Sequence, residues 1–143
     1  MLAQELMTRN VEYTSPEAVL QVAALKMKEL DVGVLPVCDE GRLVGMITDR
    51  DITLRSVSDG RDPRTDRVRD AMTADVIFCF ANQDVSVVAE LMRDKQVRRL
   101  PVLDEDNRLV GILSLGDLAQ QGGNEQLSGR VLEGISEPIS PLV

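Results

Sequence analysis

Apolar residues along this chain follow two patterns, each confined to short segments. From Val19 through Val22 to Met27 they recur every three or four residues, which predicts an amphipathic helix with this face in the core. The runs Val34–Cys38 and Leu43–Ile47 are instead continuous and aliphatic, and an acidic turn with one glycine separates them. This arrangement predicts two strands joined by a tight turn.

Signals on either side complete the first half of the chain. Ser15-Pro16-Glu17 predicts the start of the helix, with the serine as cap, the proline at the first helical position and an acid in the first turn. A short strand is expected at Val11–Thr14, and a second helix from about Asp49 to Arg55. The predicted order is strand, helix, strand, strand, helix, which makes the fold class α+β.

The second half of the chain repeats the first at an offset of 65 residues. Met7-Thr8 recurs as Met72-Thr73, and Leu35-Pro36-Val37 recurs as Leu100-Pro101-Val102. One inserted residue then raises the offset to 66 for the remaining matches. The segments predicted to fill the same five roles are Val76–Phe80, Val85–Met92, Leu100–Leu103, Leu109–Leu113 and Leu115–Ala119.

The duplication sets the predicted domain organisation. The first repeat spans residues 7–56, a polar linker 57–71, and the second repeat 72–119. Residues 120–143 contain two adjacent glycines and late prolines, so a flexible tail is expected there.

A short segment precedes each repeat in the sequence. Half a repeat has too little apolar surface to be stable alone. Ala3–Met7 and Val68–Met72 are expected to open the first and second copies, respectively. Two βαββα copies packed sheet to sheet about a pseudo-twofold axis would share one core.

Composition and charge exclude several classes of protein. The 143 residues are 43% hydrophobic and 28% charged, as is ordinary for a globular protein. Sixteen basic and 24 acidic residues give a net charge of −8, which disfavours binding to a nucleic-acid backbone. No apolar stretch approaches the roughly 20 residues that span a bilayer, and the first ten residues do not resemble a signal peptide. The expected location is the cytoplasm, with no membrane partner.

The chain has no histidine, which removes the commonest general base and metal ligand. Cys38 and Cys79 lie far apart in sequence and form no Cys-x-x-Cys motif, so no metal site is predicted. Without a histidine to pair with a nucleophile, no catalytic residue is predicted either. In a reducing cytoplasm the two cysteines are expected to be buried thiols, and whether they ever form a disulfide stays open.

The repeated motifs resemble those of the CBS domain. Each copy has Met-Thr, a helix, Leu-Pro-Val, Leu-Val-Gly or its equivalent, and Ser/Thr-x-x-Asp in the same order. Two such copies over about residues 1–120 resemble a Bateman module, and the chain looks like the small stand-alone bacterial CBS-pair proteins. The resemblance implies clefts that bind AMP, ADP, ATP, S-adenosylmethionine or NAD, no obligatory cofactor, and pairing into disc-like homodimers.

The resemblance also implies two nucleotide sites. In the first, named the Asp51 site, Asp51 would hold the ribose, and Thr48 with Arg98 and Arg99 would hold the phosphates. The spacing has a second interpretation, because Ser/Thr-x-x-Asp before a helix is also a capping box that needs no ligand. Two adjacent arginines can likewise be no more than solvated surface residues.

The second site, named the Asp117 site, consists of Ser114, Asp117 and Thr14. The positions equivalent to the two arginines are Gly33 and Val34, so this site lacks the phosphate clamp. A less charged ligand, weak binding and an empty site are the three interpretations that remain.

The sequence therefore predicts a non-enzymatic regulatory module that binds adenosine-containing ligands and acts on an unknown protein effector. The alternative is a ligand-free dimeric scaffold, stress-related in its role, in which the motifs are only helix caps.

Overall fold

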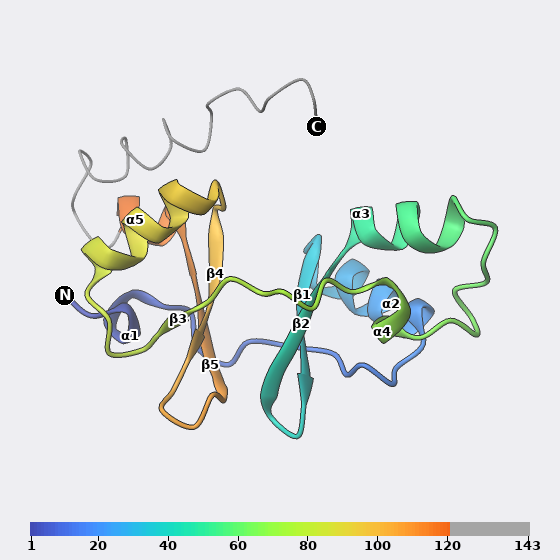
Figure 1. The fold of residues 1–143 in the computed structure, drawn as a ribbon, viewed down its shortest axis with the longest axis horizontal. Coiled ribbons are helices and arrows are strands. Elements are labelled where there is room, and N and C mark those ends of the chain that lie inside the picture. The colour runs from blue at the N-terminus through green and yellow to red at the C-terminus, as the bar shows by residue number, and fades with distance from the viewer. Residues whose placement is uncertain (121–143) are drawn as a thin grey trace. The chain divides into compact units, whose positions relative to one another are not determined.

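The structure is a computed structural model that describes residues 1–120 (Figure 1), so the predicted flexible tail lies outside the described residues apart from its first residue. The chain divides into two compact units. Unit 1 contains residues 1–11, 77–106 and those from 110 on, and unit 2 contains residues 12–76 and 107–109. Each unit thus holds most of one repeat and the segment that precedes the other.

A β-hairpin forms the sheet of unit 2. Strands β1 (Val34–Asp39) and β2 (Arg42–Thr48) pair antiparallel, with a bulge after Val37. Glu40 and Gly41 make the turn with φ of 52° and 82°, and two positive values are what a type I′ turn requires. The two predicted strands are confirmed within one residue at each end.

Unit 2 has four helical segments besides this hairpin. They are α2 (Leu20–Leu30), α3 (Asp49–Ile52), the π-helical turn η1 (Thr53–Val57) that continues it, and α4 (Val68–Ala71). The helix predicted after the hairpin is confirmed as α3 and η1. The predicted linker, residues 57–71, is partly helical, because it contains the last residue of η1 and all of α4.

The start of α2 corrects two predictions. Ser15 is not its cap, because the cap position is Val19, four residues later, and the Val19 side chain makes no capping bond. Instead, backbone carbonyls of the predicted linker accept the first helical amides: Leu20 N lies 2.9 Å from Asp66 O, and Gln21 N lies 2.9 Å from Pro63 O. Val22, predicted in the core, is 49% exposed.

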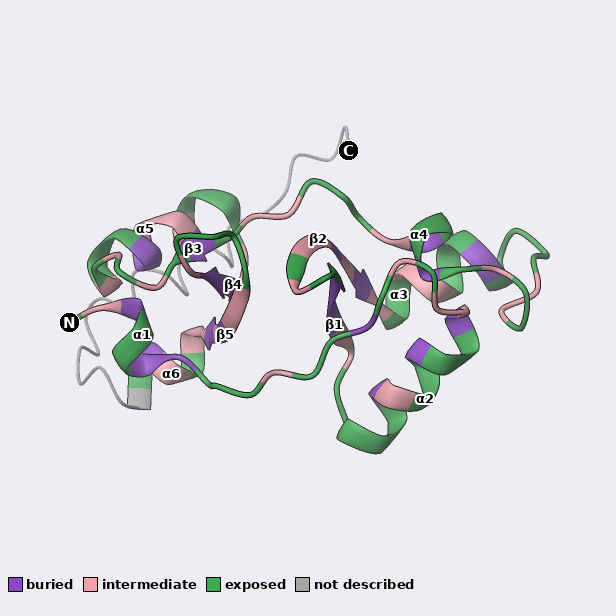
Figure 2. Ribbon diagram, turned by 90° about the horizontal axis from the view of Figure 1, so that it is seen from below, coloured by how far each residue is buried: buried purple, intermediate pink, exposed green. Residues whose placement is uncertain are grey.

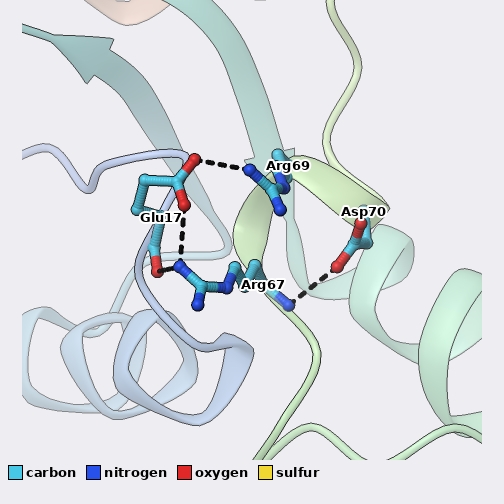
Figure 3. A network of polar contacts seen from close by, with 4 residues as sticks. All are labelled: Glu17, Arg67, Arg69 and Asp70. Atoms are coloured by element: carbon cyan, nitrogen blue, oxygen red, sulfur yellow. Dashed lines mark hydrogen bonds and ion pairs between the residues drawn. The ribbon is translucent and has the colours of Figure 1, made fainter.

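Charged side chains add a surface connection between the linker and the start of α2 (Figure 3). The Glu17 carboxylate accepts from Arg67 at 2.7 Å and from Arg69 at 2.8 Å, and Asp70 accepts from the Arg67 backbone at 3.0 Å. All four side chains are exposed, so each ion pair contributes at most about 1 kcal/mol to the free energy of unfolding.

The core of unit 2 lies between α2, the hairpin and α4 (Figure 2). Its buried residues are Leu20, Ala23, Met27, Leu35, Val37, Ile47, Val68 and Ala71. The strand predicted at Val11–Thr14 is reduced to one bridge, in which Thr14 pairs in parallel with Val37.

Unit 1 has the same plan with a third short strand. Its elements are α1 (Ala3–Leu6), β3 (Cys79–Phe80), α5 (Val85–Lys95), β4 (Arg99–Leu103), β5 (Leu109–Ser114) and α6 (Leu115–Gln120). The strand order is β3-β4-β5, with β3 parallel to β4. Asp84 caps α5 by accepting from Ser86 N at 2.9 Å.

The core of unit 1 is aliphatic, as the sequence predicts for a chain with three aromatic residues. The buried side chains are Ala3, Leu6, Met7, Cys79, Val88, Ala89, Met92, Leu100, Val102, Leu113 and Leu118. Helix α1 and Met7 therefore pack with the second repeat, although the sequence predicts that they open the first.

Each of the two Met-Thr motifs binds the hairpin of the other repeat: Met7-Thr8 lies in unit 1, and Met72-Thr73 lies in unit 2. Thr8 exchanges two backbone hydrogen bonds with Ile112, at 2.8 and 3.0 Å, and Thr73 exchanges two with Met46, both at 2.9 Å. The glycine beside each bridge leaves room for the methionine. A Cβ on Gly111 would lie 2.5 Å from Met7 Sδ, so the repeated Gly and Met-Thr motifs are docking partners.

Candidate functional site

Thr48 and Asp51 lie where β2 ends and α3 begins, and each caps the other. Thr48 Oγ1 accepts from Asp51 N at 3.0 Å, and Asp51 Oδ2 accepts from Thr48 N at 3.0 Å. The capping-box interpretation is therefore confirmed here. Both side chains are half-buried, and Asp51 Oδ1 has no hydrogen-bond partner within the described residues.

Ser114 and Asp117 repeat this geometry between β5 and α6. Ser114 Oγ accepts from Asp117 N at 3.1 Å, and Asp117 Oδ2 accepts from Ser114 N at 2.8 Å. In both pairs the hydroxyl oxygen accepts from a backbone amide, which leaves its proton for another acceptor. Each pair thus retains one hydroxyl proton and one carboxylate oxygen for further bonds.

The remaining predicted residues belong to the opposite unit in each case. Arg98 and Arg99 belong to unit 1, whereas Thr48 and Asp51 belong to unit 2. Both arginines are exposed, and among the described residues neither takes part in an ion pair. Thr14 is a buried residue of unit 2, held by backbone bonds to Pro36 and Cys38.

Asp49 is a charged residue of this region that the sequence analysis did not single out. Its Oδ2 lies 3.0 Å from the point where a Cβ on Gly33 would stand, and its backbone amide donates to Gly33 O at 2.9 Å. The sequence does contain a signal for Asp49. When the two repeats are aligned, Asp49 takes the position of Leu115, and Gly33 takes the position of Arg98.

The two cysteines are free, buried thiols. Burial raises the pKa of the Cys38 and Cys79 thiols to about 11 each, which keeps them protonated and unreactive at neutral pH. Within residues 1–120, no group of three or more Cys, Asp or Glu side chains is arranged to hold a metal ion. In the same range, no helix has the length and apolarity needed to cross a bilayer.

Comparison with known proteins identifies the repeated unit. The family model of the CBS domain matches the chain twice, at residues 3–58 and 68–122. The chain belongs to the CBS domain family. Among its relatives, CBS domain-containing protein YhcV of Bacillus subtilis (strain 168) is 41% identical over 133 residues, which cover 93% of this chain and 94% of that protein.

Two solved structures show the same CBS-pair fold. One is Hypoxic Response Protein I, solved with two coordinated zinc ions, which superposes with a TM-score of 0.77 at 36% sequence identity. The matched region covers 85% of this chain and 98% of the chain in that structure. CBSX2, solved in complex with AMP, superposes with a TM-score of 0.74 at 26% identity and covers 87% and 98%, respectively. The α+β fold with two CBS repeats is thereby confirmed, and the chain is a CBS-pair regulatory module.

Proposed function

We propose that this protein is a non-catalytic sensor of adenine nucleotides, with AMP, ADP or ATP as its ligand. The observation that carries the proposal is the Thr48–Asp51 pair, which is fixed by two hydrogen bonds and still has one hydroxyl proton and one carboxylate oxygen available. A related CBS protein, CBSX2, is solved with AMP, which supports the choice of ligand.

In the proposed Asp51 site, each group has a separate role. Asp51 Oδ1 accepts hydrogen bonds from the ribose hydroxyls, and the Thr48 hydroxyl donates to a ribose or phosphate oxygen. Arg98 and Arg99 bind the phosphates, because a planar guanidinium matches two phosphate oxygens at once and neither arginine has an ion-pair partner among the described residues.

A second nucleoside is proposed to bind at the Asp117 site, with Ser114 and Thr14 as further contacts. S-adenosylmethionine and NAD are the other ligands that the family resemblance allows. Occupancy would act on a protein effector only if the ligand prefers one arrangement of the repeats over another. We further propose a homodimer, because Val22 and Leu25 on α2 are 49% and 50% exposed and apolar.

A ligand-free scaffold is the second candidate, and the capping boxes favour it. They account for Thr48, Asp51, Ser114 and Asp117 without any ligand, since each side chain already satisfies a backbone amide.

Thermal unfolding with and without AMP, ADP, ATP, S-adenosylmethionine and NAD separates the two candidates. A ligand at 100 times its Kd adds about 2.7 kcal/mol to the free energy of unfolding. At roughly 2–4 °C per kcal/mol for a chain of this size, the midpoint should rise by about 5–10 °C. No rise with any of these compounds would leave the scaffold as the function.

Asp51→Ala tests the site, and Asp70→Ala is its matched control. Asp70 caps α4 with the same geometry, accepting from Arg67 N at 3.0 Å, but has no role in the proposed site. Both variants lose one capping bond, worth about 1 kcal/mol. Only Asp51→Ala should lose the ligand-dependent rise caused by AMP. An equal loss in both variants would show that the effect is one of stability.

A further inference from the structure

Unit 1 has a hollow of about 600 Å³ that the nucleotide proposal does not use. It is lined by Gln4 on α1, by Phe80 and Asn82 around the end of β3, and by the acidic turn Asp104–Asp106 after β4. These residues all belong to unit 1, so the hollow needs no contribution from unit 2. Its volume lies within the range of ligand-binding pockets.

The acidic turn gives one wall of the hollow three negative charges. Asp104 accepts from Asp106 N at 2.9 Å, which holds the turn together. Glu105 and Asp106 are exposed, and among the described residues neither takes part in an ion pair. Because the whole chain has a net charge of −8, a cationic partner is attracted both at long range and at this wall.

Phe80 gives the hollow an aromatic wall. This side chain is 36% exposed, in a chain with only three aromatic residues. Phe78 packs against it in a T-shaped arrangement with the ring centroids 5.5 Å apart, which fixes the Phe80 ring. A guanidinium group stacks on a ring and also binds carboxylates through two parallel hydrogen bonds, whereas an ammonium group is a strongly hydrated point charge. An aromatic wall beside carboxylates therefore favours arginine over lysine.

Unit 2 has an arginine of its own at the equivalent place (Figure 3). In unit 1, Gln4 N donates to Ala81 O at 3.0 Å. In unit 2, Arg69 N donates to Pro16 O, also at 3.0 Å, so the two backbone frameworks match. The Arg69 guanidinium pairs with Glu17 at 2.8 Å, whereas unit 1 has an uncharged amide at both equivalent positions. The fold thus accommodates an arginine here, and unit 1 does not supply one at this position.

We propose that this hollow of unit 1 binds an arginine side chain from a basic segment of a partner protein. Arg9 donates to Gln4 O at 3.0 Å but does not line the hollow. Residues 121–143 contain three acidic residues and one basic residue, so charge complementarity favours a separate protein over the chain's own tail. The inference goes beyond the proposed function and holds with or without a bound nucleotide.

Fluorescence polarisation of the full chain with a fluorescein-labelled peptide of six arginines tests the inference, and a peptide of six lysines is the probe of equal charge. The arginine peptide should bind at least about fivefold more tightly than the lysine peptide. The double variant Glu105→Gln/Asp106→Asn should weaken binding of the arginine peptide at least about tenfold, because two carboxylates are lost. Asp39→Asn/Glu40→Gln is the matched control, because it removes the same two charges from the exposed turn of the other repeat, and should change the Kd by less than about twofold.

Phe80→Leu tests the aromatic wall, because it keeps an apolar side chain and removes the ring. It should weaken binding of the arginine peptide about two- to fivefold and reduce the preference over lysine. The inference is overturned if the two peptides bind the wild-type chain equally, if Phe80→Leu retains the full preference, or if the matched control loses as much affinity as Glu105→Gln/Asp106→Asn. A wild-type chain that does not bind the arginine peptide, as when its tail or a second copy fills the hollow, overturns it as well. None of these results bears on nucleotide binding, which thermal unfolding with AMP measures separately.

Discussion

Gly45→Ala should destabilise the protein, although it adds only one methyl group. Gly45 is buried, and a Cβ at this position would lie 2.8 Å from Met72 Sδ and 2.9 Å from Thr73 O. The methionine side chain can shift, but the Thr73 carbonyl cannot move without lengthening its 2.9 Å hydrogen bond from Met46 N. The contact with backbone is therefore the one that sets the cost.

The expected magnitude follows from three opposing effects. Overpacking a core costs roughly 1–3 kcal/mol, and weakening a hydrogen bond adds about 1 kcal/mol. Replacing glycine stabilises by about 0.4–1 kcal/mol through the lower entropy of the unfolded chain. The net loss for Gly45→Ala is about 2 kcal/mol, or a drop in Tm of about 4–8 °C.

Urea denaturation of the full chain measures this loss, with Gly116→Ala as the control. Gly116 lies exposed in α6, and the nearest atom to its Cβ would be Ser114 Oγ at 3.6 Å. Alanine there should stabilise by about 0.5–1 kcal/mol, because glycine is a poor helix former. A Gly45→Ala protein as stable as wild type would refute the docking of Met72-Thr73 on the hairpin. Equal losses in both variants would refute it as well.

Two further predictions concern the cap of α5 and the buried thiols. Hydrogen bonds from the Ser86 hydroxyl and backbone amide, with a smaller effect of the N-terminal charge, lower the pKa of Asp84 below its usual 3.8. Its contribution to stability is therefore complete above pH 3.8 and is lost as the pH falls through the lowered value. The difference in stability between wild type and Asp84→Ala should shrink on going from pH 7 to pH 2, and a difference that grows over this range would contradict the assignment. Cys38 and Cys79, each with a pKa raised to about 11 by burial, should react with a thiol reagent at pH 8 only as fast as the chain opens. Adding urea should accelerate that reaction, and complete labelling of the native protein within seconds would show that the thiols are accessible.

The repeat made most of the fold predictable from the sequence. Val34–Cys38 and Leu43–Ile47 identified β1 and β2, because continuous aliphatic runs on either side of a glycine turn have few other stable arrangements. The cap of α2 could not be predicted, since its acceptors are the Pro63 and Asp66 carbonyls and a carbonyl has no sequence signature. Local capping rules therefore placed the start of α2 at Ser15.

The exchange of segments was hidden by the symmetry of the sequence. The two Met-Thr motifs are identical in sequence, and so are the two Leu-Val-Gly motifs that they bind. The sequence pattern therefore allows each Met-Thr motif to bind either its own repeat or the other one. The connections along the chain make the choice, and they appear only in three dimensions.

The candidate site was predictable in part. The Thr48–Asp51 and Ser114–Asp117 pairs follow from their spacing, because three residues is the separation that a capping box requires. The position of Asp49 against Gly33 did not follow, because it depends on the contact between two segments 16 residues apart.

A crystal structure of the protein grown with AMP tests the central claim most directly. The account predicts the ribose hydroxyls on Asp51 and the phosphate on Arg98 and Arg99. AMP bound at saturation with its ribose away from Asp51, or no AMP in the crystal at millimolar concentration, would contradict it.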